Sequence, residues 1–498
     1  MGHDLLFAAR WATIGQAIVE KGTVAEALPL QYASGQRGYG DPLGTARGGR
    51  PPEAEALNPQ DAMARTLSRA SMARFLRRMG IRVWSKDRNG AQDVRLVRQY
   101  RIPLFDLTPL ACFRSDNAPV WINQRIQQLQ DTFREVALDE DKATMRAVRL
   151  AARALHTLGL DHGLVSIGMG QKGVLYVLDV TGAPVLLGRL LDLYADAVTS
   201  FVRREEQRSG VEPGAFLLGA DVELILRNAE GKMVLASRYF TRKGRVGCDD
   251  RSIQFDGKRL PLMELRPEPD STPLGLVANL REAMLEAIEK INRANVEWRA
   301  GSMPFRRYWT GGHIHFSSIP FSSRLVKALD NYVGLPLMLV EDARTARLRR
   351  QRYGFLGDIR HKDYGGFEYR TPGSFVVHPD ITMAALCLAY VVAVHHRELP
   401  LVDLYQERLQ TAFLTGDKDL LRPIAERNLR ALSGLSAYER YKEYIDPLMD
   451  MIRRGQTWDE SVDVRTVWGL PLTIRRAGSA RRPQRGTTAR AGAAVGRG

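Results

Sequence analysis

Four short segments in the second half of the sequence alternate charged and apolar residues, and this alternation constrains the fold more than any other feature. Side chains at positions i and i+2 of a β-strand lie on the same face of a sheet. The polar pairs at this spacing are Asp221/Glu223, Glu264/Arg266, His313/His315 and Glu368/Arg370. The residues between them, Val222, Leu265, Ile314 and Tyr369, are apolar or aromatic. The pattern predicts a sheet with one face packed against helices and one face that presents acids, histidines and arginines.

Helical patterns lie between these strand-like segments. Thr272 and Pro273 are typical of an N-cap and a first helical position, and a further helix is predicted from Ser322 to about Val340. The apolar run Ile381–Val394 reads as a buried helix, and a mostly helical segment follows from about Leu401 to Arg454. Strands interrupted by helices are typical of an antiparallel sheet covered on one face, so the predicted class is α+β.

A chain of 498 residues is longer than one hydrophobic core usually organises. We expect a mixed α/β unit over residues 1–203, with a flexible Gly/Pro-rich loop at 33–52 and a helix capped by Asn58 and ended by Gly80. The remaining predicted segments are a linker at 204–214, a catalytic domain at 215–400, its helical C-terminal part at 401–474 and a disordered basic tail at 475–498.

Composition excludes several classes of protein. Three distant cysteines without a CxxC pair exclude a disulfide scaffold and a zinc ribbon, and fit a reducing cytoplasm. The longest apolar run has 14 residues, whereas a bilayer span needs about 20, and the first residues lack a secretory signal pattern. We therefore expect a cytoplasmic protein without a membrane partner. The net charge is +16, of which the seven arginines of the tail account for 7.

The residue types of the polar face indicate its chemistry. Carboxylates with one or two imidazoles suit Mg²⁺ or Mn²⁺, and arginines can bind phosphate or carboxylate in a bidentate way. Glycine pairs before two of the strands, Gly311-Gly312 and Gly365-Gly366, suit close approach of a ligand. Metal, phosphate and carboxylate together are what an ATP-driven ligase with an acyl-phosphate intermediate requires.

Six ordered motifs carry a family resemblance. GADVELIL, SRYFTRKGRVGCDD, LMELRPEP, GGHIHFS, RYGFLGDIR and GGFEYRTPGSF resemble, in this order, the amidoligases of the phage-type COOH-NH2 ligase family, which are relatives of glutamine synthetase and glutamate–cysteine ligase. The resemblance covers about residues 215–400. It implies a glutamine synthetase-like sheet and an ATP-dependent carboxylate–amine ligase with metals on the sheet face.

The resemblance also implies roles for individual residues. The implied metal ligands are Asp221, Glu223, Glu264, His313 and Glu368. The implied catalytic residues are Glu264, Arg266, Arg360, Glu368 and Arg370, and the implied nucleotide contacts are His313, His315 and Arg370. It leaves open which histidine contacts metal or nucleotide. Because the first strand reads DxE where glutamate–cysteine ligases usually have ExE, it also leaves open whether Asp221 reaches a metal directly.

The first half has a resemblance of its own. The segments ALNPQDAMARTLSRASMARFLRRMGI and ALHTLGLDHGLVSIGMGQKGVLYVLDVTGAPVL are similar to the first and last parts of an ATP-grasp domain. Such domains usually end their last strand in an acid-x-Asn metal pair, and this chain has Asp179-Val180-Thr181 there. The resemblance makes Asp179 a candidate cofactor-binding residue. It leaves open whether the unit works on a nucleotide or is a degenerate scaffold.

Two other functions compete with a ligase. The HxH pair is also a zinc signature, so a metal-dependent hydrolase is one alternative. The positive charge suggests a nucleic-acid-associated protein as the other, although the strands lack the aromatic and basic pattern of RNA-binding sheets and only the tail suits nonspecific contact. The run RLRRQR (347–352) is either a solvated helix end or a phosphate-binding segment. We expect small-molecule or peptide carboxylate and amine substrates; their identity and the oligomeric state stay open.

Overall fold

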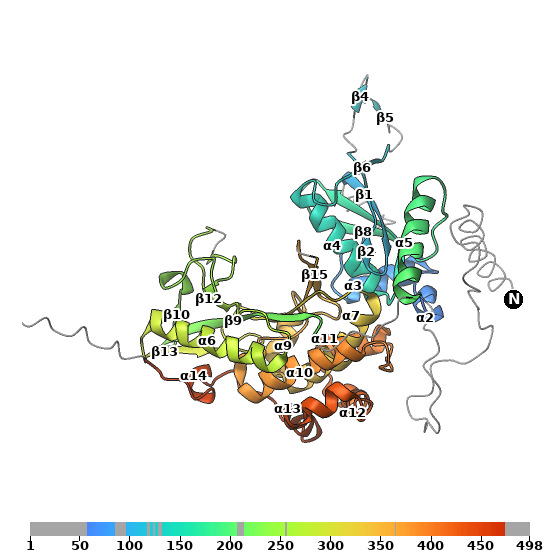
Figure 1. Ribbon diagram of the computed structural model, residues 1–498. Coiled ribbons are helices and arrows are strands. Elements are labelled where there is room, and N and C mark those ends of the chain that lie inside the picture. Colours follow the sequence, from blue (N-terminus) through green and yellow to red (C-terminus); the bar gives the residue numbers. More distant parts are fainter. Residues whose placement is uncertain are drawn as a thin grey trace, which may run out of the picture.

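The computed structural model describes residues 57–84, 96–116, 120–122, 125–127, 132–206, 214–253, 256–363 and 365–473. The predicted loop at 33–52 and the predicted tail at 475–498 lie outside the described residues, as do residues 207–213 of the predicted linker. The described elements form two main sheets, each with its own hydrophobic core (Figure 1). We call residues 57–206 the N-terminal unit and residues 214–473 the C-terminal unit.

The N-terminal unit is an antiparallel sheet with helices packed on it. Its main sheet has the strand order β6-β3-β1-β7-β8, with β2 paired to β1. Helix α4 packs on β7 and β8, and α5 contacts β1. The strands are β1 (Leu96–Phe105), β2 (Thr108–Pro109), β3 (Cys112–Ser115), β4 (Val120–Ile122), β5 (Arg125–Gln127), β6 (Arg134–Val136), β7 (His162–Gly170) and β8 (Leu175–Thr181). The helices are α2 (Gln60–Ala64), α3 (Arg69–Arg78), α4 (Lys142–Thr157) and α5 (Arg189–Glu206).

The helix predicted between Asn58 and Gly80 is divided in two, and the prediction that Asn58 caps it is wrong. Pro59 takes the N-cap position of α2, and Ser68 caps α3. Asn58 has a φ of 55°, and its side-chain amide instead donates to the carbonyl oxygens of His162 (2.9 Å) and Gly182 (3.1 Å). Its amide therefore ties the start of α2 to the β7–β8 hairpin rather than capping a helix.

The C-terminal unit is built on an eight-stranded antiparallel sheet. The strand order is β11-β12-β9-β14-β16-β15, and β10 and β13 both pair with β9. The strands are β9 (Leu217–Asn228), β10 (Met233–Val234), β11 (Val246–Cys248), β12 (Leu262–Leu265), β13 (Val296–Arg299), β14 (Gly312–Ser317), β15 (Ile359–His361) and β16 (Phe367–Tyr369). The helices are η1 (Ala236–Arg238), α6 (Pro273–Ile291), α7 (Ser323–Leu329), η3 (Asp330–Gly334), α8 (Leu335–Val340), α9 (Ala343–Arg350), η4 (Phe375–Val377), α10 (Pro379–His395), α11 (Glu407–Thr415), α12 (Lys418–Arg430), α13 (Ser436–Arg453) and α14 (Val464–Val467).

Helices cover one face of this sheet, as the alternation predicts. Helix α6 packs on β9, β11 and β12, and the apolar helix α10 packs against α6 and α13 (Figure 1). The four residues between the polar pairs are fully buried in this core: Val222, Leu265, Ile314 and Tyr369. Together with the antiparallel pairing of both sheets, this packing confirms the predicted α+β class.

Local sequence explains where two of these helices begin and change. Thr272 caps α6 by accepting a hydrogen bond from the amide of Gly275 at 3.1 Å, with Pro273 at the first position, as predicted. The predicted helix from Ser322 to Val340 exists, but it contains the π-helical turn η3. Pro336 lies just after this turn, and proline cannot donate the usual hydrogen bond one turn back. The irregular turn places Asp330 inside the protein.

The two units share a close interface. Val326 of α7 belongs to the core of the N-terminal unit, and Lys327 Nζ lies 2.7 Å from Asp161 Oδ1. The amide of Ser323 donates to Asp106 Oδ1 at 2.6 Å. Helix α5 continues to Glu206, so the first residues of the predicted linker are helical; the domain boundaries themselves stay a prediction. Among the described helices, none is long and apolar enough to cross a bilayer.

Candidate functional site

The register of the C-terminal sheet gathers the predicted polar pairs on one face. Residues directly opposite each other on paired strands point to the same side of a sheet. The facing pairs are Glu264/Glu223, His313/Asp221, His315/Glu368 and Arg360/Glu368. Five strands, β9, β12, β14, β15 and β16, therefore contribute to a single patch.

A cavity of about 360 Å³ lies over this patch, and we call it the sheet cavity. Segments that follow β10 and α9 contribute to its walls, so the face is less open than the strand pattern suggests: Glu223, Glu264, His313 and Glu368 are buried. The residues that line it are Asp221, Glu223, Arg242, Cys248, Asp249, Asp250, Arg251, Glu264, Arg266, Trp309, Thr310, Gly311, His313, Arg349, Tyr353, Asp358, Arg360, Lys362, Glu368 and Arg370.

Two groups of side chains in the sheet cavity have the geometry of metal sites. In each group one ligand atom per residue lies within 4.8 Å of the others. The groups are Asp221/His313/Glu368 and Glu223/Glu264/His313, so His313 belongs to both. Carboxylate oxygens with a single imidazole form a ligand set suited to Mg²⁺ or Mn²⁺.

Electrostatics support a cation beside Glu264. Burial, followed by repulsion from Asp221 and Glu223, raises the pKa of Glu264 to about 8, although Arg266 is in direct contact with its carboxylate. Burial and the two neighbouring carboxylates thus outweigh the contact with Arg266 at this position. A divalent cation would supply the missing positive charge, so the residues present fit a metal ion.

Glu368 has the opposite environment. Burial would raise the pKa of this carboxyl, but His313, Arg360 and Lys362 lower it well below its usual range. His313 Nδ1 lies 3.0 Å and Arg370 Nε 3.1 Å from Glu368 Oε1, while Lys362 Nζ lies 2.8 Å and Arg360 Nε 3.4 Å from Oε2. Glu368 is therefore ionised and holds three cationic side chains at the cavity wall.

The structure distinguishes the two histidines. His313 lines the sheet cavity and belongs to both candidate metal groups. His315 does neither among the described residues; its Nε2 lies 3.0 Å from Asp221 Oδ2. Burial opposes ionisation of Asp221, yet its pKa is lowered because His315 and His313 stabilise the carboxylate. His315 is thus placed to orient Asp221 from the side.

Several cavity residues escaped the sequence analysis because they lie on loops rather than strands. Arg251 Nη2 lies 2.5 Å from Glu223 Oε2, and its Nε lies 2.7 Å from Asp249 Oδ1. Arg370 Nη1 lies 3.8 Å from Asp358 Oδ1. The run of acids in GCDD and Lys362, two positions after Arg360, were the available signals, but neither has a periodicity that fixes the direction of its side chains.

Asp179 lies outside the sheet cavity, and Arg349 lies in its wall. Asp179 is on β8 of the N-terminal sheet, where its Oδ2 accepts a hydrogen bond from Thr181 Oγ1 at 3.1 Å, and it does not line the sheet cavity. In the run 347–352, Arg349 is buried and donates to the carbonyl oxygens of Thr371 (2.8 Å) and Pro372 (2.6 Å). Most of its donors are therefore used within the protein, and it supports the wall of the cavity rather than ending a solvated helix.

Comparisons with curated sequences and with solved structures do not identify the N-terminal unit. No curated protein sequence matches the chain. One similar solved structure is the crystal structure of a bifunctional glutathione synthetase from Pasteurella multocida, with a TM-score of 0.33 and 12% sequence identity over 52% of this chain and 51% of that chain. The chain thus spans about half the length of that structure, and a similarity of this size does not establish a shared fold, so the ATP-grasp likeness of the N-terminal unit stays a prediction.

A family match covers just over half of the chain. The family described as "Phage phiEco32-like COOH.NH2 ligase-type 2" matches residues 218–470. This range contains both candidate metal groups and all the predicted site residues except Asp179. The chain therefore belongs to this family of carboxylate–amine ligases.

Proposed function

We propose that the chain is an ATP- and Mg²⁺-dependent ligase that joins a carboxylate to an amine through an acyl phosphate. The observation that carries this proposal is the pair of carboxylate–imidazole groups that share His313, next to the cations around Glu368. Membership of the family supports the joining of a carboxyl to an amino group. Phosphoryl transfer needs metal ions and cationic donors around one phosphate. In the sheet cavity, residues that would hold a metal ion lie next to cationic side chains.

The proposed metal ligands are the carboxylates of Asp221, Glu223, Glu264 and Glu368 and the imidazole of His313. Mg²⁺ bound there would neutralise charge on the transferred phosphoryl group and orient it. Mn²⁺ suits the same ligands.

The cationic residues of the chain act on the anionic parts of the substrates. Arg360, Lys362 and Arg370 line the cavity and are held by Glu368, and each has N–H donors left for phosphate or carboxylate oxygens. We propose that Arg370 and Lys362 bind the terminal phosphate and that Arg266, which contacts Glu264, orients this carboxylate. An oxygen of the substrate carboxylate then attacks the terminal phosphorus and ADP leaves. The amine nitrogen attacks the acyl carbon, phosphate leaves, and the amine proton is released to a carboxylate of the cavity or to water.

The alternative of a zinc hydrolase would use both histidines of the HxH pair on one ion. Among the described residues, His315 belongs to neither candidate metal group, whereas His313 belongs to both. The geometry therefore favours the ligase.

A library experiment tests the proposal. The full-length chain is incubated with ATP, Mg²⁺ and pooled carboxylates and amines, and ADP release and new amide masses are read together. We expect ADP release that needs both substrates and that falls by more than about 100-fold in Glu368→Gln. Glu230→Gln, the same change at an exposed turn, is the matched control and should keep full activity. Bond hydrolysis that needs metal but no ATP would contradict the ligase and support the hydrolase.

A further inference from the structure

Helix α4 of the N-terminal unit carries a row of arginines: Arg146, Arg149 and Arg153. Residues three and four positions apart lie on the same face of a helix, so these three side chains form one stripe. In Figure 1, α4 is the helix of the N-terminal unit drawn next to β15, a strand that lines the sheet cavity.

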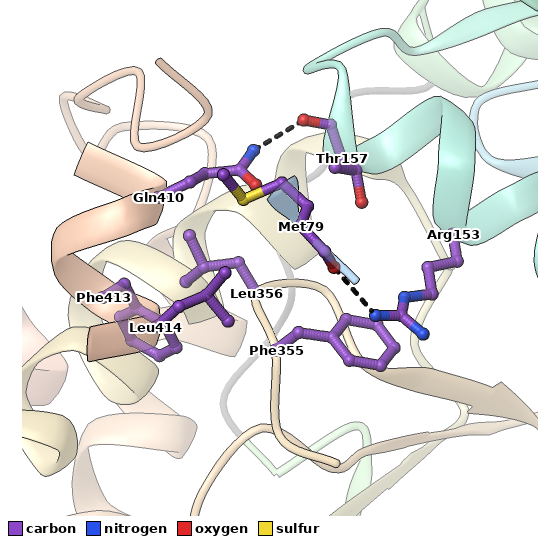
Figure 2. A pocket seen from close by; sticks show the side chains of 8 residues that line it. All are labelled: Met79, Arg153, Thr157, Phe355, Leu356, Gln410, Phe413 and Leu414. Atoms are coloured by element: carbon purple, nitrogen blue, oxygen red, sulfur yellow. Dashed lines mark hydrogen bonds between the residues drawn. The ribbon is translucent and has the colours of Figure 1, made fainter. Parts of the chain in front are cut away.

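Contacts at the C-terminal end of α4 fix its orientation. The guanidinium of Arg153 lies 3.8 Å from the centre of the Phe355 ring and donates to the carbonyl oxygen of Met79, and the carbonyl oxygen of Thr157 accepts a hydrogen bond from Gln410 Nε2 at 2.6 Å (Figure 2). The space between these side chains is about 10 Å³, room for one water molecule at most, so the two units are in close contact here. The face of α4 that carries Arg153 is therefore held against the C-terminal unit.

One turn earlier on the same face, Arg149 has a largely exposed side chain. Desolvation and the nearby charges of Arg360 and Arg370, two residues that line the sheet cavity, lower the pKa of Arg149. Within the described residues, neither Arg149 nor Arg146 has an acidic partner. Arg98 on the neighbouring strand β1 differs, because it pairs with Asp116 and Asp141. The stripe thus brings positive charge that has no described counter-ion toward the side of the cavity that Arg360 and Arg370 line.

We propose that Arg149 and Arg146 extend the sheet cavity into a binding track for an acidic peptide. The reacting carboxylate lies at the metal-binding face, and further carboxylates of the same peptide lie along α4. The inference rests on the proposed ligase function and names the class of its acyl substrate. Arg146 and Arg149 are about 4.5 Å apart along the helix axis, similar to the advance of about 3.5 Å per residue in an extended peptide, so neighbouring carboxylates can reach both.

The chemistry of the stripe favours a peptide over a nucleic acid. Single-stranded nucleic acids are bound by aromatic side chains that stack on bases between cationic residues. Helix α4 contains no Phe, Tyr or Trp. The planar guanidinium group of arginine instead matches the planar geometry of a carboxylate. The net charge of +16 attracts polyanions to the chain as a whole.

Binding of a defined probe tests the proposal without turnover. The probe is fluorescein-labelled hexaglutamate, titrated with the full-length chain in the absence of ATP and followed by fluorescence anisotropy at 50 mM and 200 mM salt. We expect Arg149→Ala and Arg146→Ala each to weaken binding by roughly five- to tenfold, and Arg149→Lys to recover most of the loss. Arg74→Ala is the matched control, because Arg74 is an exposed arginine of the same unit whose side chain contacts Ser71; binding should stay within twofold.

Several results would overturn the proposal. The first is a wild-type chain that does not bind hexaglutamate. The second is an Arg149→Ala variant that binds hexaglutamate as tightly as the wild type does. The third is a tighter, Arg149-dependent binding of hexathymidylate, which would make the track a nucleic-acid site. Equal weakening of MgATP binding by Arg149→Ala would assign Arg149 to the nucleotide. If the chain binds the peptide through Arg149 but never releases ADP, the proposed ligase function is refuted while the proposed peptide-binding track stands. Failure of the ligase function and failure of the track can therefore be told apart.

Discussion

Replacing Glu264 by Gln should stabilise the protein without metal and remove most of its stabilisation by Mg²⁺. The side chain of Glu264 is buried, and burial together with the charges of Asp221 and Glu223 raises its pKa from an ordinary 4.5 to about 8. Glutamine keeps the shape of this side chain and has no charge. The substitution therefore separates the electrostatic contribution of Glu264 from its packing.

The size of the effect follows from proton linkage. Between pH 4.5 and about 8 the folded protein keeps a proton on Glu264 that the unfolded chain has lost, so the free energy of unfolding falls as pH rises through this window. At about 1.4 kcal/mol per pH unit, the cost to the folded state at pH 7 is about 3 kcal/mol. Glu264→Gln removes this cost and should raise the melting temperature by roughly 3–6 °C at pH 7. At pH 4.5 the two proteins should melt together.

Melting curves in EDTA and in Mg²⁺, each from pH 4.5 to 8, measure both parts of this prediction. Mg²⁺ at about 100 times its dissociation constant should stabilise the wild type by about 2.7 kcal/mol at pH 7.5 and the variant by much less. Glu230→Gln controls for the loss of a carboxylate at an exposed position and should melt as the wild type does in both buffers. A Glu264→Gln variant with wild-type melting in EDTA at every pH, or with an undiminished response to Mg²⁺, would refute the electrostatic argument.

Three further predictions concern other residues. In the full-length chain, His313→Ala should abolish Mg²⁺-dependent ADP release, while His315→Ala should lower it by about tenfold. The reason is that, among the described residues, His313 belongs to both candidate metal groups and His315 to neither. Equal, mild effects of the two substitutions would exclude a metal role for this strand. Arg370→Ala should lower the rate of ADP formation far more than Asp179→Asn, for which we expect less than a tenfold loss, equivalent to about 1.4 kcal/mol of barrier; the reverse ranking would move the nucleotide site to the N-terminal unit. Asp330→Ala should lower the free energy of unfolding, measured in urea, by at least about 3 kcal/mol, because its carboxylate oxygens accept three buried donors; a loss below 1 kcal/mol would contradict this.

The alternation of four strands was sufficient to predict the face on which the candidate site lies. A strand has a strict period of two, so one apolar neighbour such as Val222 or Ile314 determines where the polar pair points. The strand order and register follow from pairings such as Glu264 with Glu223, which no local pattern contains. The sequence therefore predicted which side chains share a face but not which of them touch.

Local rules failed where long-range contacts were stronger. Asn58 has the residue type of a helix cap, but hydrogen bonds with the chain more than 100 residues away hold it in another conformation. The position of Arg251 also depends on a contact distant in sequence, an ion pair with Glu223, 28 residues earlier. Such partners lie on loops without periodicity, so composition marks them as charged and nothing in the sequence marks where they point.

The same alternation explains how the N-terminal unit is tied to the candidate site. Strand β16 turns Glu368 toward the cavity and Tyr369 toward the helices, where the Tyr369 hydroxyl donates to Asp330 Oδ1 at 2.8 Å. The other oxygen of Asp330 lies 3.2 Å from Nε2 of His156, a buried residue of α4. Gly357 permits this approach, because a Cβ there would lie about 2 Å from the His156 ring, and its φ of +68° also favours glycine. Glu368, a proposed metal ligand, is thus adjacent in sequence to Tyr369, which begins a series of contacts through Asp330 to His156 of the N-terminal unit. Changes at this interface should therefore affect the candidate site.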